Sequence, residues 1–182
     1  MLRSIRRIVT TNDERGRSRI LIDGPATKKI TVLTEMWLTD GANTGNTGNE
    51  DFAERSNQLE PPRHGTLFRY FEIAPERDSA HLPKEELCRA TREWFADMKG
   101  EHLQVDTSRH PAMHKSQTTD YIILLSGRIT LVLDDEEVDL EPFDAVIQRG
   151  TNHAWANRGT EPALLVAVLV DTRGDPAGED HG

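Results

Sequence analysis

Cysteine, long apolar runs and net positive charge are all scarce in this 182-residue sequence. The single cysteine, Cys88, excludes an internal disulfide and any metal site built from several thiolates. No apolar run approaches the roughly 20 residues needed to cross a bilayer. Acidic residues (31) outnumber Lys and Arg (22), so binding driven by nucleic-acid phosphates is not expected. We therefore expect a soluble protein with neither membrane nor nucleic-acid partners.

The length is typical of one domain, and no internal repeat divides it. The first residues, MLRSIRR, are basic but lack the apolar stretch of a secretory signal. Together with the single cysteine, this favours a cytoplasmic location.

Short stretches of alternating polar and apolar residues predict a mainly β protein. In the first half the predicted strands are residues 5–10, 19–22, 30–38 and 65–73. In the second half they are residues 121–125, 128–133, 137–140, 145–148 and 163–170, joined by short turns. The last of these strands is apolar throughout, so we expect it to be covered on both faces.

Two segments depart from this pattern. Residues 83–99 show apolar positions three and four apart, and this spacing predicts one amphipathic helix that begins at Pro83 and ends before Gly100. Residues 40–64 are rich in Gly, Asn and Pro and are expected to form a long loop. Either segment could cover a binding site, and the helix could equally pack on the outer wall. The polar tail, residues 172–182, is expected to be disordered.

Polar candidates for chemistry gather at the ends of the later strands. His110 and His114 precede the strand that Asp120 begins, Gln148 closes a later strand, and His153 follows it. Two or three histidines with a carboxylate suit a divalent transition metal such as iron, manganese, nickel, cobalt or zinc, and the sequence does not rank these metals.

Strand alternation indicates which of these side chains share a face. It places Asp120 with Ile122 and Leu124, and it places Gln148 with Val146. If both faces point inward, a carboxylate, an amide and the nearby imidazoles meet in an apolar pocket. Tyr121 points away from Asp120 and should cover the outer face of the sheet.

Residues 110–170 resemble a cupin domain. The first cupin motif ends in an acidic residue, six further residues and a glycine, as in Asp120, YIILLS and Gly127. The second motif, Pro-x-Gly-x-x-His-x-x-x-Asn, corresponds to QRGTNHAWAN at residues 148–157, with Gln148 in place of the proline. This resemblance implies a mainly all-β, cupin-type β-barrel, a double-stranded β-helix or jelly roll, with extra N-terminal strands and one amphipathic helix. The expected layout is a frame over residues 1–100, a cupin core over 101–171 and the tail.

The resemblance also implies a ligand set. His153 matches the metal-binding histidine of the second motif, Asp120 stands where a glutamate is usual, and His114 resembles the histidine of the first motif. The usual His-x-His pair is missing because Ala112 occupies its other position. His110 is a candidate for an additional ligand.

Gln148 is another candidate ligand, or it could bond the next loop. Arg149, Gln148 and Trp155 are candidate substrate-binding residues, and Arg158 could also clamp a substrate carboxylate. The resemblance implies a homodimer, for which the N-terminal strands are candidate added edges.

Three interpretations of the histidines follow. They bind a metal with Asp120; they form a metal-free pocket in which Asp120 and His114 act as acid and base; or they are structural. The leading hypothesis is a metal-dependent enzyme acting on a small carboxylate- or carbonyl-bearing metabolite, as a lyase, dehydratase, decarboxylase or isomerase, or as a dioxygenase if iron is bound. The alternative is a small-molecule-binding cupin without turnover.

Overall fold

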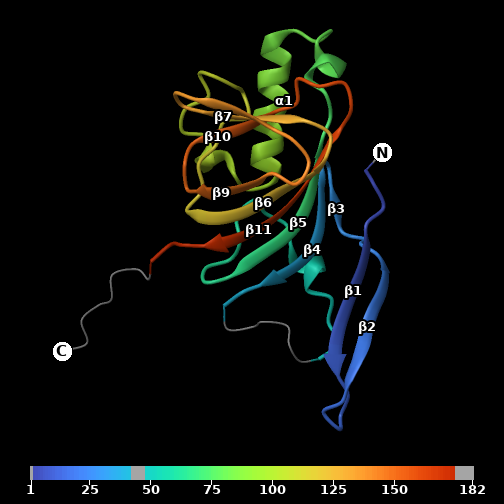
Figure 1. The fold of residues 1–182 in the computed structure, drawn as a ribbon. Coiled ribbons are helices and arrows are strands. Elements are labelled where there is room, and N and C mark those ends of the chain that lie inside the picture. The colour runs from blue at the N-terminus through green and yellow to red at the C-terminus, as the bar shows by residue number, and fades with distance from the viewer. Residues whose placement is uncertain (1, 42–47, 175–182) are drawn as a thin grey trace, which may run out of the picture.

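A computed structural model describes residues 2–41 and 48–174 of the chain. In these residues eleven strands, one α-helix and three short 3-10 helices form a mainly β structure (Figure 1). This confirms the predicted fold class. Within the described ranges no helix is long and apolar enough to cross a membrane.

The first two strands form a hairpin of their own. β1 (Arg6–Asn12) and β2 (Ser18–Pro25) pair antiparallel and make no ladder with the other sheets, and the hairpin stands at one side of the molecule (Figure 1). Buried Arg7 joins it to the body by donating to the Met36 carbonyl (2.9 Å) and to Asp51 Oδ1 (2.8 Å). The extra N-terminal strands are therefore present as a separate two-stranded sheet.

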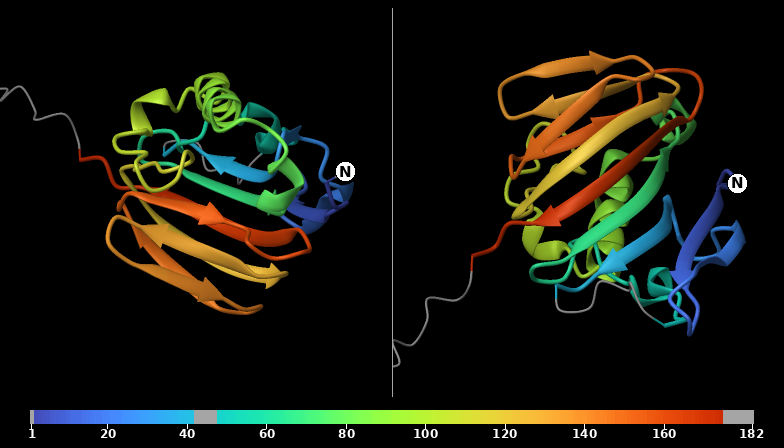
Figure 2. Two further views of the ribbon diagram at one scale, coloured as in Figure 1. Left: turned by 90° about the horizontal axis from the view of Figure 1, so that it is seen from above. Right: turned by 60° about the horizontal axis from the view of Figure 1, so that its bottom comes forward.

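Two antiparallel sheets make the body of the fold (Figure 2). The larger has the order β3-β4-β5-β11-β6-β9. Its strands are β3 (Lys29–Ile30), β4 (Leu33–Thr39), β5 (Thr66–Ile73), β6 (Thr118–Ser126), β9 (Ala145–Arg149) and β11 (Ala163–Asp171). The smaller has the order β10-β7-β8, with β7 (Ile129–Leu133), β8 (Glu137–Leu140) and β10 (His153–Ala156).

One hydrophobic core joins the two sheets. Ile122 and Leu124 of β6 and Leu165 of β11 pack with Ile129 of β7 and Leu140 of β8. The sheets therefore face each other as in a jelly roll, which is the architecture that the cupin resemblance implies.

Two details of the strands differ from the sequence prediction. The single strand predicted over residues 30–38 is wrong, because the chain turns at Thr31, whose φ is 49°, and β3 folds back on β4. The strand β10 was not predicted, because its residues lie inside a short motif with no clear alternation of polarity.

Helix α1 (Lys84–Asp97) confirms the predicted helix, and the proline before it serves as its N-cap residue. Phe95 of its last turn and the C-cap residue Met98 pack on Leu33, Leu59 and Leu103. The predicted 40–64 loop includes a 3-10 turn, η1 (Phe52–Arg55), and its residues 42–47 lie outside the described ranges. Residues 175–182 of the predicted disordered tail also lie outside them.

Candidate functional site

A cavity of about 460 Å³ lies between the six-stranded sheet, β10 and α1. Most of its wall is apolar, including Ile122 of β6 and Leu169 of β11. The polar side chains that line it include His114, His153 and Asp120. The structure thus brings together the three residues that the sequence proposed as the centre of the site.

The two histidines lie directly opposite each other. The backbones of His114 and His153 exchange two hydrogen bonds of 2.9 Å, which places both side chains on one side with ring centroids 4.3 Å apart. Nδ1 of His114 donates to the Ala112 carbonyl and Nδ1 of His153 to the Thr151 carbonyl, both at 3.0 Å. These partners fix the tautomer, so each Nε2 carries a lone pair, and no described residue hydrogen-bonds to either Nε2.

Burial keeps both imidazoles neutral. It lowers the pKa of His114, and it lowers the pKa of His153 to about 3, with the neighbouring His114 adding to the effect. The hydrogen bonds to backbone carbonyls oppose these shifts but are weaker than burial. The pair can therefore accept hydrogen bonds at Nε2 but resists taking up a proton.

Asp120 is a buried carboxyl group on the inner face of β6. Its side chain is 5% exposed, and Oδ1 has no hydrogen-bond partner among the described residues. Burial raises the pKa of Asp120 to about 6, while the Thr118 hydroxyl and the positive charge of Arg69 act in the opposite direction. At neutral pH this carboxyl group exchanges a proton readily, which suits a general acid or base.

Sequence reasoning missed a buried ion pair beside this carboxyl group. Arg69 of β5 lines the cavity and lies 3.0 Å from Glu35 of β4, nitrogen to oxygen, and the Glu35 side chain is fully buried. Arg69 also donates to the carbonyls of Leu59 (3.0 Å) and Gln58 (3.1 Å). The sequence did contain a signal for this ion pair, because Arg69 lies on the same face of its strand as the apolar residues Leu67 and Phe71.

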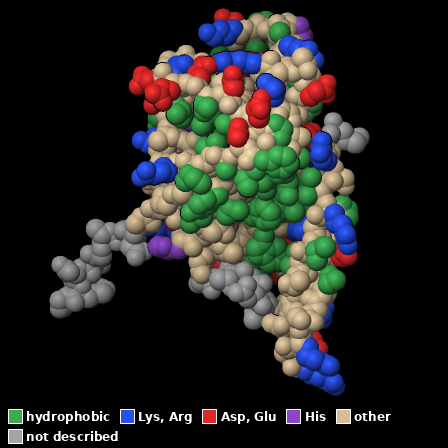
Figure 3. Space-filling view, viewed as in Figure 1, with side chains coloured by type: hydrophobic (Ala, Val, Ile, Leu, Met, Phe, Trp, Pro, Cys, Tyr) green, Lys and Arg blue, Asp and Glu red, His purple; other side chains and the backbone are tan. Residues whose placement is uncertain are grey.

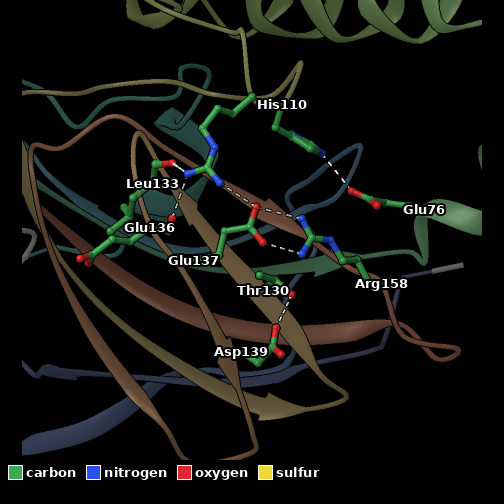
Figure 4. A network of polar contacts seen from close by, with 9 residues as sticks. Glu76, His110, Thr130, Leu133, Glu136, Glu137, Asp139 and Arg158 are labelled. Atoms are coloured by element: carbon green, nitrogen blue, oxygen red, sulfur yellow. Dashed lines mark hydrogen bonds and ion pairs between the residues drawn. The ribbon is translucent and has the colours of Figure 1, made fainter.

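His110 lines the cavity, but both of its nitrogens already have partners. Nε2 contacts Glu76 Oε1 at 3.0 Å (Figure 4), and Nδ1 accepts from the Ala112 amide at 3.1 Å.

Gln148 is buried outside the cavity lining and donates to the Thr151 carbonyl at 3.3 Å. Its side chain therefore bonds the following loop, as one of the two interpretations of the sequence proposed.

The three other predicted substrate-binding side chains are placed differently. Trp155 lines the cavity, with its ring centroid 5.9 Å from that of His153. Arg149 is exposed and lies outside the lining. Arg158 is held by Glu137, at 2.6 and 3.1 Å (Figure 4), and Glu137 also accepts a hydrogen bond from Arg109 at 3.1 Å. The hydrogen bond to Arg158 is the main reason that the pKa of Glu137 is lowered.

The described residues do not gather three ligands of the kind that the resemblance implies for a transition metal. His114 and His153 supply two nitrogens, but Ala112 packs on apolar neighbours where a further histidine is usual. Across the described ranges, no three His, Cys, Asp or Glu side chains lie together in an arrangement that could hold one ion. The metal set of His114, Asp120 and His153 stays a prediction.

Comparison with known proteins finds similarity over part of the chain. Residues 101–169 match the family model of the cupin domain. The chain is 49% identical over 63 residues to phomopsin biosynthesis cluster protein C' of Diaporthe leptostromiformis, which covers 34% of this chain and 33% of that protein. It is 36% identical over 63 residues to the cupin-domain-containing oxidoreductase fogC of Aspergillus ruber. This match covers 32% of this chain and 31% of that protein. The matches thus span about a third of these curated relatives.

A search of solved structures matches part of the backbone to an RmlC-like cupin family protein from Methanocaldococcus jannaschii. The two chains share 10% identity with a TM-score of 0.38, over 64% of this chain and 77% of that one.

Proposed function

We propose that this chain, whose residues 101–169 match the cupin domain, is an enzyme that transfers a proton on a small hydroxyl- or carbonyl-bearing molecule bound in the cavity. One observation carries the proposal: a carboxyl group that titrates near neutral pH shares an apolar cavity with two neutral imidazoles whose Nε2 atoms are open to a ligand. Such a combination is typical of acid–base catalysis.

The protonation of each side chain in the cavity determines its proposed role. Both Nδ1–H groups donate to backbone carbonyls, so the Nε2 atoms of His114 and His153 accept a hydrogen bond from a substrate hydroxyl and orient it. Asp120 takes a proton from the substrate or returns one to it, because its pKa of about 6 makes both protonation states accessible. The apolar wall excludes water and strengthens these interactions. Elimination of water, decarboxylation and isomerisation all need proton transfer of this kind.

The relatives support an enzymatic role in small-molecule biosynthesis. One is named as a biosynthesis cluster protein and another as an oxidoreductase. An oxidation needs an electron acceptor as well as a proton carrier. Oxygen consumption during turnover therefore distinguishes an oxidase or dioxygenase from the redox-neutral reaction proposed here.

The decisive experiment compares Asp120→Asn with the wild type on a panel of hydroxylated and carbonyl metabolites. The matched control is Asp135→Asn, which makes the same substitution at an exposed position in the turn between β7 and β8. We expect Asp120→Asn to lower turnover by about 100-fold or more, and Asp135→Asn to leave it unchanged. Equal activity in Asp120→Asn and the wild type would overturn the assignment of the proton carrier. Ligands that bind the wild type but are never consumed would favour the non-catalytic alternative.

The metal-dependent form of the enzyme is tested separately. Protein purified without chelator is measured for iron, manganese, nickel, cobalt and zinc. Stoichiometric metal that is lost in both His114→Ala and His153→Ala would replace the metal-free proposal with the metal-dependent one. Full activity after dialysis against chelator supports the proposal.

A further inference from the structure

Six aromatic rings line the cavity in an unbroken series. Five centroid distances connect them: Trp94 to Phe95 (5.1 Å), Phe95 to His114 (5.3 Å), His114 to His153 (4.3 Å), His153 to Trp155 (5.9 Å) and Trp155 to Phe71 (6.1 Å). These rings come from α1, the segment before β6, β10 and β5. We call this series the aromatic arc.

The arc concentrates a scarce residue type at one place. Phe, Trp and Tyr make up only 5% of the sequence, and two of its three tryptophans stand in this cavity. Aliphatic side chains such as Leu33 and Leu169 complete the wall, and the rings border open space of about 460 Å³ where a close-packed core would leave none. That volume lies within the range of small-molecule sites. Ring faces and edges around open space suit a flat aromatic ligand, which gains offset-stacked or edge-to-face contacts.

The charges around the cavity argue against an anionic ligand. Within the described ranges, Arg69 is the one Lys or Arg side chain that lines it, and Glu35 and two backbone carbonyls already engage that guanidinium. Asp120 and Glu76 add carboxyl groups to the lining. A carboxylate would therefore lose its hydration without gaining an unpaired cation.

The polar end of the cavity suits a hydroxyl group. Each Nε2 of His114 and His153 offers a lone pair and no proton, so the pair recognises a donor rather than an acceptor. The rings of both histidines are also part of the arc. A hydroxyl attached to an aromatic ring can thus reach the imidazole nitrogens while its ring lies against the neighbouring aromatic side chains.

We propose that the ligand class of this cavity is an uncharged, planar aromatic alcohol, a phenol or fused-ring hydroxyarene, held by the aromatic arc and by the Nε2 atoms of His114 and His153. This inference deepens the proposed function and rests on it for the chemical step alone. It narrows the hydroxyl- or carbonyl-bearing molecule of the proposed function to a neutral aromatic hydroxyl compound, and it departs from the carboxylate- or carbonyl-bearing substrate expected from the sequence.

Three probes of similar size test the inference by titration calorimetry. 2-Naphthol is flat and carries a hydroxyl, decahydro-2-naphthol keeps the hydroxyl but is not aromatic, and 2-naphthoate is flat but anionic. We expect 2-naphthol to bind about 10-fold more tightly than either of the others, since only this probe combines aromatic contacts with a neutral hydroxyl group. Equal or tighter binding of the saturated alcohol or of the carboxylate would overturn the inference.

Variants locate the binding. Trp155→Leu and Trp94→Leu should each reduce the preference for 2-naphthol over its saturated analogue by about 3- to 10-fold. Trp37→Leu is the matched control, because Trp37 stacks on Phe52 outside this cavity. The ratio of two affinities within one variant does not depend on a modest loss of stability. An unchanged ratio in both cavity variants contradicts the role of the arc.

The same measurements separate this inference from the proposed function. Asp120→Asn should bind 2-naphthol about as well as the wild type while losing turnover. If 2-naphthol fails to bind and a non-aromatic substrate is turned over through Asp120, the ligand class is wrong and the proposed function stands. If 2-naphthol binds and Asp120→Asn retains full activity, the ligand class stands and the proposed function is wrong.

Discussion

The two faces of the six-stranded sheet differ sharply although they are built from the same strands. On β6, Asp120, Ile122 and Leu124 point inward and are at most 5% exposed. Tyr121 (53%) and Ile123 (40%) alternate with them and point outward. Figure 3 shows that exposed hydrophobic side chains gather on one face of the molecule. The inner face thus buries a titratable group among apolar side chains, while the outer face exposes apolar side chains to water.

This contrast shows that burial, more than residue type, decides what a side chain does here. Asp120 is useful for proton transfer because its surroundings are apolar, which raises its pKa to about 6. The outer apolar residues contribute little to the stability of the isolated chain because they stay exposed to water. Large exposed apolar patches often mark interaction surfaces. Substitutions at matched inner and outer positions should therefore have unequal effects.

The largest effect on stability is expected where a buried charge loses its partner. Arg69→Met leaves the Glu35 carboxyl group fully buried without its ion-pair partner, so the free energy of unfolding should fall by about 3–5 kcal/mol. Arg128→Met removes an exposed ion pair with Glu141 and should cost less than about 1 kcal/mol. Urea unfolding of both variants measures the difference. Similar losses in the two would contradict the importance of the buried pair.

Neighbouring aliphatic residues on β6 give the next contrast. Leu124→Ala opens a cavity in the core between the sheets and should lower the free energy of unfolding by about 2–5 kcal/mol. Ile123→Ala removes an exposed side chain and should cost less than about 1 kcal/mol. A larger loss for Ile123→Ala, measured by thermal unfolding of dilute protein, would mean that the outer face is covered.

Acidification should weaken the inner face through His153. The unfolded chain takes up a proton at this residue near pH 6.5, whereas the folded chain does so only near pH 3, so stability falls as the pH falls through this window. Between about pH 6.5 and 5, His153 alone should cost on the order of 2 kcal/mol. Asp120, with a folded pKa raised from 3.8 to about 6, acts in the opposite direction and offsets part of this loss.

The pH dependence is measured by urea unfolding at several pH values. His153→Gln should flatten the loss on acidification, and Asp120→Asn should steepen it. Parallel pH profiles in the wild type and His153→Gln would show that the histidine is not held neutral.

The smallest expected effect on the folded chain concerns the homodimer that the cupin resemblance implies, which stays a prediction. If a second copy covers the outer face, Tyr121→Lys and Ile147→Lys should weaken self-association by about 10-fold or more, while leaving the unfolding of the isolated chain nearly unchanged. Val138→Lys, on the smaller sheet, is the control. Sedimentation at several concentrations checks this. A monomer at all concentrations, or a dimer insensitive to both outer-face variants, would contradict the prediction.

Much of the inner face could be predicted from local patterns. Alternation correctly placed Asp120, Ile122 and Leu124 together, because successive side chains in a strand point to opposite faces. The same rule placed Tyr121 outward. The cupin-like motifs placed His114 and His153 near Asp120, and all three line one cavity.

Other parts of the site could not be predicted in this way. Glu35 and Arg69 are 34 residues apart and meet because β4 pairs with β5 in one register. The aromatic arc joins Trp94 of α1, Trp155 of β10 and Phe71 of β5, which no sequence spacing connects. The break at Thr31 depends on β3 pairing back on β4.

The sequence by itself determined most of the strands, though not β10 or the break at Thr31, together with the apolar side of β6 and the short motifs that resemble a cupin, because these depend on side chains a few positions apart. Only the tertiary structure decided which polar groups are neutral, which charges are paired and where open space remains. Those properties depend on how strands distant in sequence pack, since desolvation, ion pairing and cavity shape arise from the surroundings of a side chain rather than from its identity.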